Sequence, residues 1–130
     1  MTIELVNPAG LFTPASYSHV AVATGSRLVF VAGQVADDGQ GLVGLGDLAA
    51  QARQAFANVG RALAAVGARP DQVARITIYV VHHRPEYLPA ISEARIAVFG
   101  DHRPADVVLG VEALAHPELL IEVDAIAVVD

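Results

Sequence analysis

The first third of the chain contains two short segments, residues 17–24 and 27–34, in which apolar and polar positions alternate or apolar positions dominate. Such patterns are typical of β-strands, whose successive side chains point to opposite faces. The segments are separated by Gly25-Ser26, a dipeptide that predicts the turn of a β-hairpin. A short additional strand is expected at residues 3–6.

A helical pattern follows a glycine-rich segment. Residues 37–46 combine glycines with two aspartates, a composition that predicts a loop or a distorted hairpin tip. Asp47 is the predicted N-cap of a helix that ends at Gly67. The apolar positions of this helix recur at intervals that place them on one stripe, and they are Leu48, Ala52, Ala55, Phe56, Val59, Leu63 and Val66.

The second half of the chain predicts a strand, a helix and two further strands. Residues 73–81 alternate with a period of two and leave one apolar face, which predicts a strand. A proline suits the first turn of the helix predicted over residues 84–99, and a glycine follows its end. Residues 105–111 and 119–129 are the remaining predicted strands.

The predicted order, β-β-α-β-α-β-β, indicates a single α+β domain over residues 1–130, with two helices on one face of one mixed sheet of about six strands. Two helices cover only one face of such a sheet. Yet Val29 and Val31 lie on one face of a predicted strand, and Leu28 and Phe30 lie on the other. Monomers seldom expose a large apolar face, so we expect a closed homo-oligomer packed through its sheets.

Composition narrows the class of function. Hydrophobic residues make up 54% of the chain and charged residues 17%, which excludes intrinsic disorder and fits burial against another subunit. All eight basic residues are arginines, spread singly, and the net charge of −6 argues against a nucleic-acid partner. No leader segment is recognised and no apolar run is long enough to span a membrane, so we expect a cytoplasmic protein without a membrane partner.

Several kinds of site lack their motifs. The absence of cysteine excludes disulfides, thiolate nucleophiles and cysteine-based zinc sites. No glycine-rich phosphate loop is present, and no serine lies in a nucleophile elbow. His82 and His83 would point to opposite sides of a strand, and no two histidines have helical metal-binding spacing. We therefore expect no metal and no cofactor.

Four short patterns lie at the ends of predicted elements: Tyr17-Ser18-His19, Val31-Ala32-Gly33-Gln34, Arg103-Pro104-Ala105-Asp106, and Ile-Glu-Val-Asp-Ala-Ile-Ala at residues 121–127. In this order and spacing they resemble the RidA/YjgF family, also labelled endoribonuclease L-PSP-like. Members of that family carry a Pro-Tyr-Ser segment, a Ser-Gly-Gln strand end, a Pro-Ala-Arg strand start and a closing Val-Glu-Ile-Glu strand. The resemblance spans essentially the whole chain and includes the helix pattern of Gln51 and residues 56–59.

The resemblance implies a chorismate-mutase-like fold and a homotrimer whose sheets form a barrel-like centre with the helices outside. It also implies small-molecule pockets between subunits, where members of the family hydrolyse reactive 2-imino acids to 2-keto acids and ammonia. In the family, the arginine of Pro-Ala-Arg anchors the substrate carboxylate, and an acidic residue of the last strand orients the attacking water.

The family's site residues match this chain unevenly. Glu122 takes the place of the pocket glutamate, and Asp106 stands where the carboxylate-binding arginine is expected, so these two are the implied catalytic positions. Five substrate-binding residues are implied as well. Tyr17 and Gly33 match the family, whereas Ala32 replaces its serine. Ser92 lies near the family's usual helix asparagine, and Val107 follows Asp106.

The aspartate changes the expected chemistry. At about 4 Å and an effective dielectric constant near 20, a substrate carboxylate is attracted to arginine by about 4 kcal/mol, and an aspartate reverses the sign. Archetypal deamination of 2-imino acids is therefore not expected unless Arg95 or Arg103 supplies a cation. If Asp106 instead faces Glu122, repulsion between the two carboxylates would raise the proton affinity of one of them. The pair would then be a general acid or a cation-binding site. The alternatives are an exposed Asp106 at a strand start and an outward-facing Glu122.

Two functions follow as hypotheses. The first is a trimeric enzyme that hydrolyses an imine-like metabolite with water activated at Glu122, with Asp106 as a proton carrier. The second is a non-catalytic module of the same family that binds a small metabolite or a partner. Ribonuclease activity is disfavoured because the chain is acidic and has no lysine.

Overall fold

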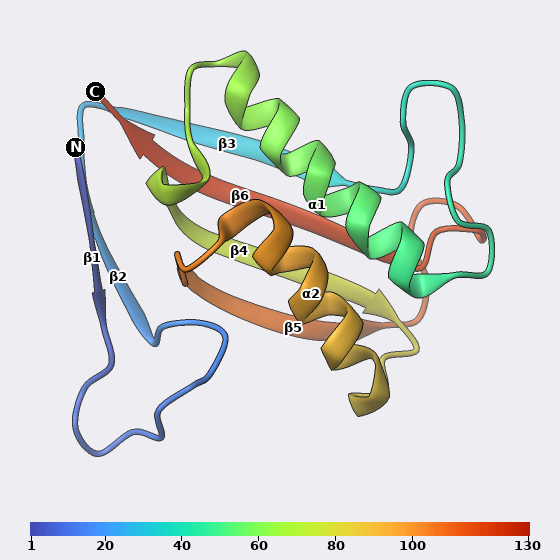
Figure 1. Ribbon diagram of the computed structural model, residues 1–130, viewed down its shortest axis with the longest axis horizontal. Coiled ribbons are helices and arrows are strands. Elements are labelled where there is room, and N and C mark those ends of the chain that lie inside the picture. Colours follow the sequence, from blue (N-terminus) through green and yellow to red (C-terminus); the bar gives the residue numbers. More distant parts are fainter.

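The computed structural model of the protein describes residues 1–130, which form six strands and two helices in the expected order (Figure 1). The strands are β1 (Thr2–Val6), β2 (Val20–Thr24), β3 (Arg27–Gln34), β4 (Val73–Val81), β5 (Ala105–Val111) and β6 (Ile121–Val129). The helices are α1 (Leu48–Ala65) and α2 (Leu88–Phe99). Two short 3₁₀ turns are also present, Pro70–Gln72 before β4 and Pro85–Tyr87 before α2.

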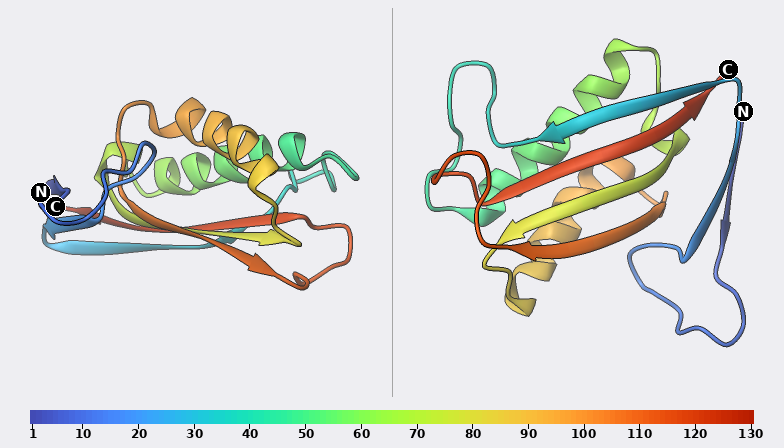
Figure 2. Two further views of the ribbon diagram at one scale, coloured as in Figure 1. Left: turned by 90° about the horizontal axis from the view of Figure 1, so that it is seen from below. Right: turned by 180° about the vertical axis from the view of Figure 1, so that it is seen from behind.

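Four strands form the main sheet in the order β3-β6-β4-β5. β6 is antiparallel to both β3 and β4, whereas β4 and β5 are parallel, so the sheet is mixed. Both helices lie on one face of it, and the other face carries no helix (Figure 2). The α+β class and the one-sided helical layer are therefore confirmed.

The predicted hairpin between residues 17–24 and 27–34 is wrong. β2 pairs with β1 in a separate two-stranded sheet, and β3 pairs with β6, so the six strands form two sheets instead of one. Gly25 lies where the chain passes the end of β6, and a Cβ there would come within 2.2 Å of Val128 Cγ1. The glycine therefore permits a crossing between two sheets, a close approach that resembles a hairpin turn in sequence.

The core lies between the helices and the covered face of the sheet. Its members alternate along β4 and β6 and recur along α1, as the periodicity predicts, and the fully buried ones include Phe56, Val59, Leu63, Ile76, Ile78, Val80, Ile121 and Val123. On the uncovered face the side chains are partly or largely exposed. Leu28 is 63% exposed and Phe30 is 71% exposed, although both are large and apolar.

The predicted helix boundaries are close to the observed ones. Asp47 is the N-cap of α1, and its side chain accepts a hydrogen bond from the backbone amide of Ala50 at 3.1 Å. The second helix begins at Leu88 instead of residue 84, after the 3₁₀ turn that starts at Pro85. Neither helix has the length and hydrophobicity that crossing a membrane requires.

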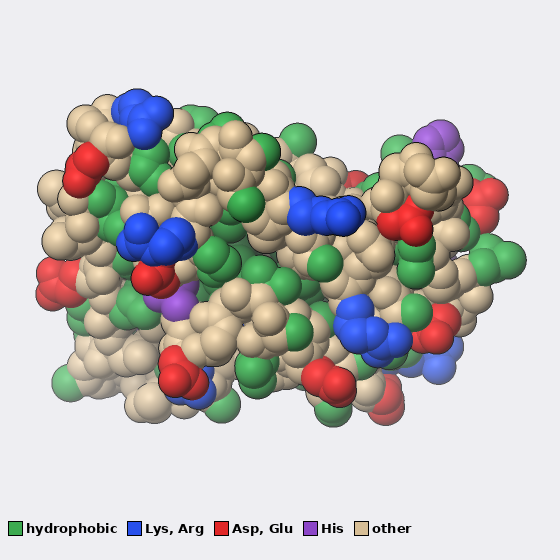
Figure 3. All heavy atoms as spheres, turned by 45° about the horizontal axis from the view of Figure 1, so that its top comes forward, with side chains coloured by type: hydrophobic (Ala, Val, Ile, Leu, Met, Phe, Trp, Pro, Cys, Tyr) green, Lys and Arg blue, Asp and Glu red, His purple; other side chains and the backbone are tan.

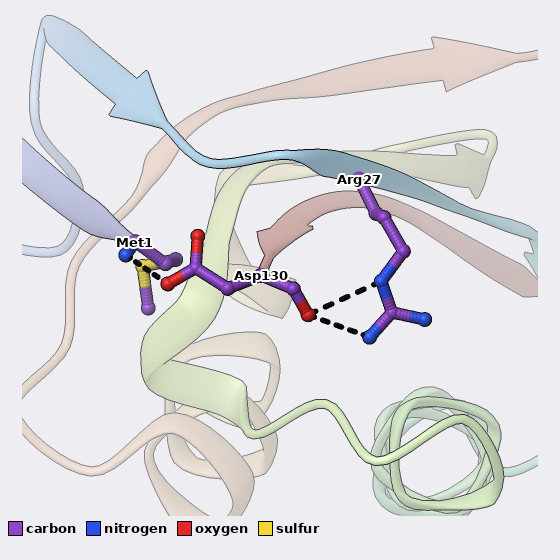
Figure 4. A network of polar contacts seen from close by, with 3 residues as sticks. All are labelled: Met1, Arg27 and Asp130. Atoms are coloured by element: carbon purple, nitrogen blue, oxygen red, sulfur yellow. Dashed lines mark hydrogen bonds and ion pairs between the residues drawn. The ribbon is translucent and has the colours of Figure 1, made fainter.

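The first and last residues lie side by side. The amino group of Met1 forms an ion pair with the Asp130 side chain, and the guanidinium of Arg27 donates to the Asp130 carbonyl at 2.7 and 3.2 Å (Figure 4). These contacts attach β1 to the ends of β3 and β6. They also lower the pKa of the Asp130 side chain, mainly through its hydrogen bond with the amino terminus.

The long loops are held by a buried amide. Gln51 of α1 is fully buried, and its Nε2 donates to the carbonyls of Gly44 at 3.1 Å and Glu118 at 2.9 Å. Its Oε1 accepts from the amide of Leu120 at 2.9 Å. One side chain thus satisfies three backbone groups from the glycine-rich loop and from the segment that leads into β6.

Replacing Gln51 with methionine should retain most of the volume but leave these three backbone groups without partners in the interior. We expect the free energy of unfolding, measured by urea denaturation, to fall by about 2–4 kcal/mol. Arg53→Ala, on the exposed side of the same helix, is the control and should change it by less than about 0.5 kcal/mol. Equal stabilities for Gln51→Met and wild type would contradict this role.

Candidate functional site

A cavity of about 600 Å³ lies beside α2, where the helix, the start of β5 and the loop between β1 and β2 approach one another. Four of the six residues predicted from the sequence to contact a ligand, other than Glu122, line it: Tyr17, Ser92, Asp106 and Val107. Apolar side chains that include Leu88 and Ile91 complete much of the wall. The structure therefore brings together residues that are up to 90 positions apart in the chain, from Tyr17 to Val107.

The loop is fixed to β5 through the backbone. Ser18 forms a parallel bridge with Ala105, and its amide donates to the carbonyl of Pro104 at 3.3 Å. Pro104 is itself fully buried. This contact places Tyr17, one residue earlier, beside the first residues of β5 and opposite α2.

Arg95 and Asp106 form an ion pair at the cavity. Arg95 Nη2 lies 2.6 Å from Asp106 Oδ2, and the two side chains are only 6% and 3% exposed. Arg95 Nη1 also donates to the carbonyl of Ser16 at 2.6 Å. The guanidinium thus links α2 to β5 and to the loop. Arg103, the other candidate cation, is exposed.

Burial dominates the electrostatics of this pair. It raises the pKa of Asp106 from 3.8 to about 6, because the attractions of Arg95 and Arg75 only partly offset the loss of hydration. Burial also lowers the pKa of Arg95, again against the attraction of the carboxylate. At pH 7 Asp106 is still mostly ionised, so the pair is a true salt bridge whose acidic member gains protons in mild acid.

Asp106 and Glu122 do not meet. Asp106 lies opposite Ile76 of β4, which lies opposite Ala125 of β6, so these three residues share the helix-covered face. Glu122 is three positions from Ala125 along β6 and therefore points to the uncovered face. The prediction that Asp106 and Glu122 form an acidic pair is therefore wrong within one chain, because the strand register places the two side chains on opposite faces of the sheet.

Glu122 instead lies against the end of β3. The pairing of β3 with β6 shifts register between Val31 and Gln34, which leaves Ala32 and Gly33 as a bulge. A Cβ at Gly33 would lie 2.1 Å from Glu122 Oε2, so a larger residue there would displace the carboxylate from its present position. Ala32 and Gly33 are exposed, and Glu122 is half-buried. The predicted residues thus form two groups on opposite faces of the sheet.

Tyr79 lies next to Glu122 but was not predicted from the sequence to belong to the site. Tyr79 lies directly opposite Glu122 on β4, and its hydroxyl donates to Asp124 Oδ2 at 3.1 Å. Burial, the bond to Asp124 and the nearby acidic charges raise the pKa of Tyr79. Its place in an alternating strand gave no signal, because which residues lie opposite it depends on strand pairing.

Arg95 had a recognisable signal in the sequence. It lies four residues after Ile91 and four before Phe99, so helical spacing places it on the buried stripe of α2. An arginine on a buried stripe requires an acidic partner. In the structure that partner is Asp106. No group of three His, Cys, Asp or Glu side chains is arranged to hold a metal ion.

Comparisons with known proteins agree on one family. Residues 10–129 match the model of the family described as Endoribonuclease L-PSP. A RutC family protein from Pyrococcus horikoshii is 32% identical over 108 residues, which cover 75% of this chain and 85% of that protein.

Solved structures show the same similarity. The structure of YyfB from Yersinia pestis, a protein of unknown function of the conserved Rid family, has a TM-score of 0.91 and 39% identity, over 98% of this chain and 99% of that one. A YjgF/YER057c/UK114 family member from Mycobacterium tuberculosis has a TM-score of 0.65 and 33% identity, over 86% of each chain. These similarities confirm the expected chorismate-mutase-like arrangement of two helices on a mixed sheet.

The raised pKa of Asp106 predicts a specific pH dependence of stability. Between pH 3.8 and about 6 the folded protein binds a proton that the unfolded chain has lost, so Asp106 stabilises the fold at low pH and this contribution is lost as pH rises. We expect the unfolding free energy of wild type, relative to Asp106→Asn, to fall by about 3 kcal/mol or less from pH 4 to pH 6.5. Urea denaturation of both proteins across this range is the measurement. A difference that stays constant or rises with pH would show that burial does not dominate at this carboxyl.

Proposed function

Since the chain belongs to the endoribonuclease L-PSP family, also known as the RidA/YjgF family, we propose that it is a homotrimer that binds a small metabolite between its subunits. There it hydrolyses an imine-like carbon–nitrogen bond. A cytoplasmic location is part of the same proposal.

The uncovered face of the main sheet supports the oligomer. Leu28 and Phe30 of β3 and Leu109 of β5 expose large apolar side chains there, and Figure 2 shows no element lying over these strands. Monomeric proteins rarely leave such a face in water. A second copy packed on this face would bury it, and a closed ring of three copies would leave none of it exposed.

The division of the site into two groups is the observation that carries the proposal. Tyr17 and Ser92 line the cavity on the helix side, whereas Glu122 and Gly33 lie on the uncovered face. A single chain cannot bring a ligand into contact with both groups. Copies packed through their sheets can, because the uncovered face of one copy then lies near the β5 edge of the next. The pocket is incomplete without the partner subunit.

Glu122 is the proposed catalytic residue. Its carboxylate accepts a proton from water while the water oxygen attacks the carbon of the C=N bond, and the imine nitrogen takes up a proton. The resulting carbinolamine then collapses: Glu122 returns its proton to the nitrogen, the C–N bond breaks to release ammonia or an amine, and the hydroxyl loses its proton to solvent as the carbonyl forms, which balances the proton that the imine nitrogen took from solvent. The neighbouring bulge at Ala32 and Gly33 offers exposed backbone groups that can position the substrate.

A carboxylate on the substrate is not required by this arrangement. The cation in the cavity, Arg95, is already paired with Asp106, so it does not act as an open anchor for a 2-imino acid. The same pairing favours a second candidate function, a metabolite-binding module without catalysis, because the cavity is electrically neutral whether or not Glu122 activates a water.

RNA is the less suitable substrate. The chain carries a net charge of −6 and has no lysine. On the face that carries the helices, the arginines lie apart from one another and are interspersed with acidic side chains (Figure 3). Binding to a phosphate backbone requires a continuous basic surface.

Placing a charge on the uncovered face should disrupt the oligomer. Phe30→Glu would bury a carboxylate in the proposed interface, so sedimentation or light scattering should give a trimer for wild type and a monomer for this variant. Leu45→Glu is the matched control, since Leu45 is 75% exposed in the glycine-rich loop and should leave the trimer intact. A wild-type monomer would refute the shared pocket.

Catalysis is tested with imines generated in situ. An amine oxidase supplies an uncharged imine and an amino-acid oxidase supplies a 2-imino acid, and ammonia release is timed with and without the protein. We expect acceleration with the uncharged imine and a loss of about 100-fold or more in Glu122→Gln. Asp124→Asn, two residues along the same face, is the control for charge and should retain activity. Saturable binding without acceleration of either imine would instead favour the non-catalytic module.

A further inference from the structure

The cavity contains a complete charge pair of its own. Of the residues that line it, only Arg95 and Asp106 carry a charge, and they lie 2.6 Å apart. The rest of the wall is apolar or bears hydroxyl groups, those of Ser16, Tyr17 and Ser92. The cavity therefore has no net charge although it holds a guanidinium.

Each terminal nitrogen of that guanidinium has a partner, whereas Nε is buried without one. Nη1 of Arg95 donates to the carbonyl of Ser16, and Nη2 faces Asp106, each at 2.6 Å. Arginine binds a carboxylate through N–H groups that lie in one plane and point to one side. Here the carboxylate of Asp106 lies against Nη2 as an ion pair and already compensates the positive charge. A ligand carboxylate would have to displace it or lie beside it as a second anion.

We propose that Asp106 is a built-in anion that closes the anion-binding position of Arg95, so that the cavity takes an uncharged polar ligand and rejects carboxylates. This inference rests on the proposed role of the cavity as a small-molecule site. A cationic ligand is also disfavoured, because Arg95 would lie as close to it as Asp106 does. Asp106 is thus a specificity-determining residue, and Ser92 and Tyr17 are left as the groups that hydrogen-bond to the ligand.

The proposal predicts that a carboxylate site can be uncovered by one substitution. Asp106→Ala removes the carboxylate, leaves space of about its size and leaves Arg95 buried without a counter-ion. Formate or acetate should bind in that space and restore stability. We expect the melting temperature of the variant to rise by about 3 °C or more in 50 mM formate relative to equal chloride. Wild type should show no such difference.

Two controls isolate the guanidinium. Acetamide, which has the shape of acetate without its charge, should not rescue Asp106→Ala. The double variant Arg95→Met/Asp106→Ala should not respond to formate or acetate, because the cation is gone. A folded Asp106→Ala protein that formate and acetate stabilise no more than chloride does would overturn the proposal. If the variant is unfolded in chloride, recovery of its circular dichroism in formate is the same test.

The wild-type protein provides an arm that does not depend on a variant. Binding of 2-methylpropanamide and 2-methylpropanoate, which differ only in amide against carboxylate, is compared by ligand-observed NMR. We expect the amide to bind about tenfold more tightly or better. Equal or tighter binding of the carboxylate would overturn the proposal. Neither readout requires imine hydrolysis, so failure of the proposed reaction and failure of this inference are distinguishable.

Discussion

A buried charge needs a partner, and this requirement joins three segments that are distant in the sequence. Arg95 lies on the inner side of α2, where its side chain is almost wholly removed from water. Removal of such a cation and its carboxylate partner from water costs several kcal/mol for each ion, and only close contact offsets that cost. Asp106 on β5 and the carbonyl of Ser16 in the β1-β2 loop provide this contact. The position of the cavity wall is therefore a consequence of satisfying one guanidinium.

The two faces of the sheet determine where the remaining polar groups lie. Alternation along β6 sends Val123 into the core and Glu122 to the uncovered face, and alternation along β5 gives Asp106 to the helix side. Residues that are neighbours in the sequence thus belong to different environments. Since the helices cover one face only, an arrangement that uses both groups of residues needs a second copy of the chain.

The parts of the fold that were predictable from sequence are those that local physics decides. The order of elements, the N-cap at Asp47 and the buried stripe of α1 depend on residues a few positions apart, and they were predicted correctly. Strand pairing is different. The turn at Gly25-Ser26 resembles a hairpin, but β3 is paired by β6, about 100 residues later in the chain, so no local pattern shows the change of sheet.

The same distinction applies to the candidate site. The sequence could identify Tyr17, Ser92 and Asp106 individually, and the structure brings them to one cavity. It could not decide whether Arg95 or Arg103 reaches that cavity. Two features decide this question. The position of Arg95 on the buried side of α2 and the parallel pairing of β5 with β4 bring Arg95 against Asp106, whereas Arg103 is exposed.

Asp106 and Arg95 compensate each other's charge at the cavity, the strand supplying the carboxylate and the helix supplying the guanidinium. Either residue alone would leave a buried, uncompensated charge, which costs about 3–5 kcal/mol. Burial raises the pKa of Asp106 to about 6 even with Arg95 beside it, so loss of the arginine would raise that pKa further. Asp106 and Arg95 therefore depend on each other, and the pocket acquired its neutrality from both residues together.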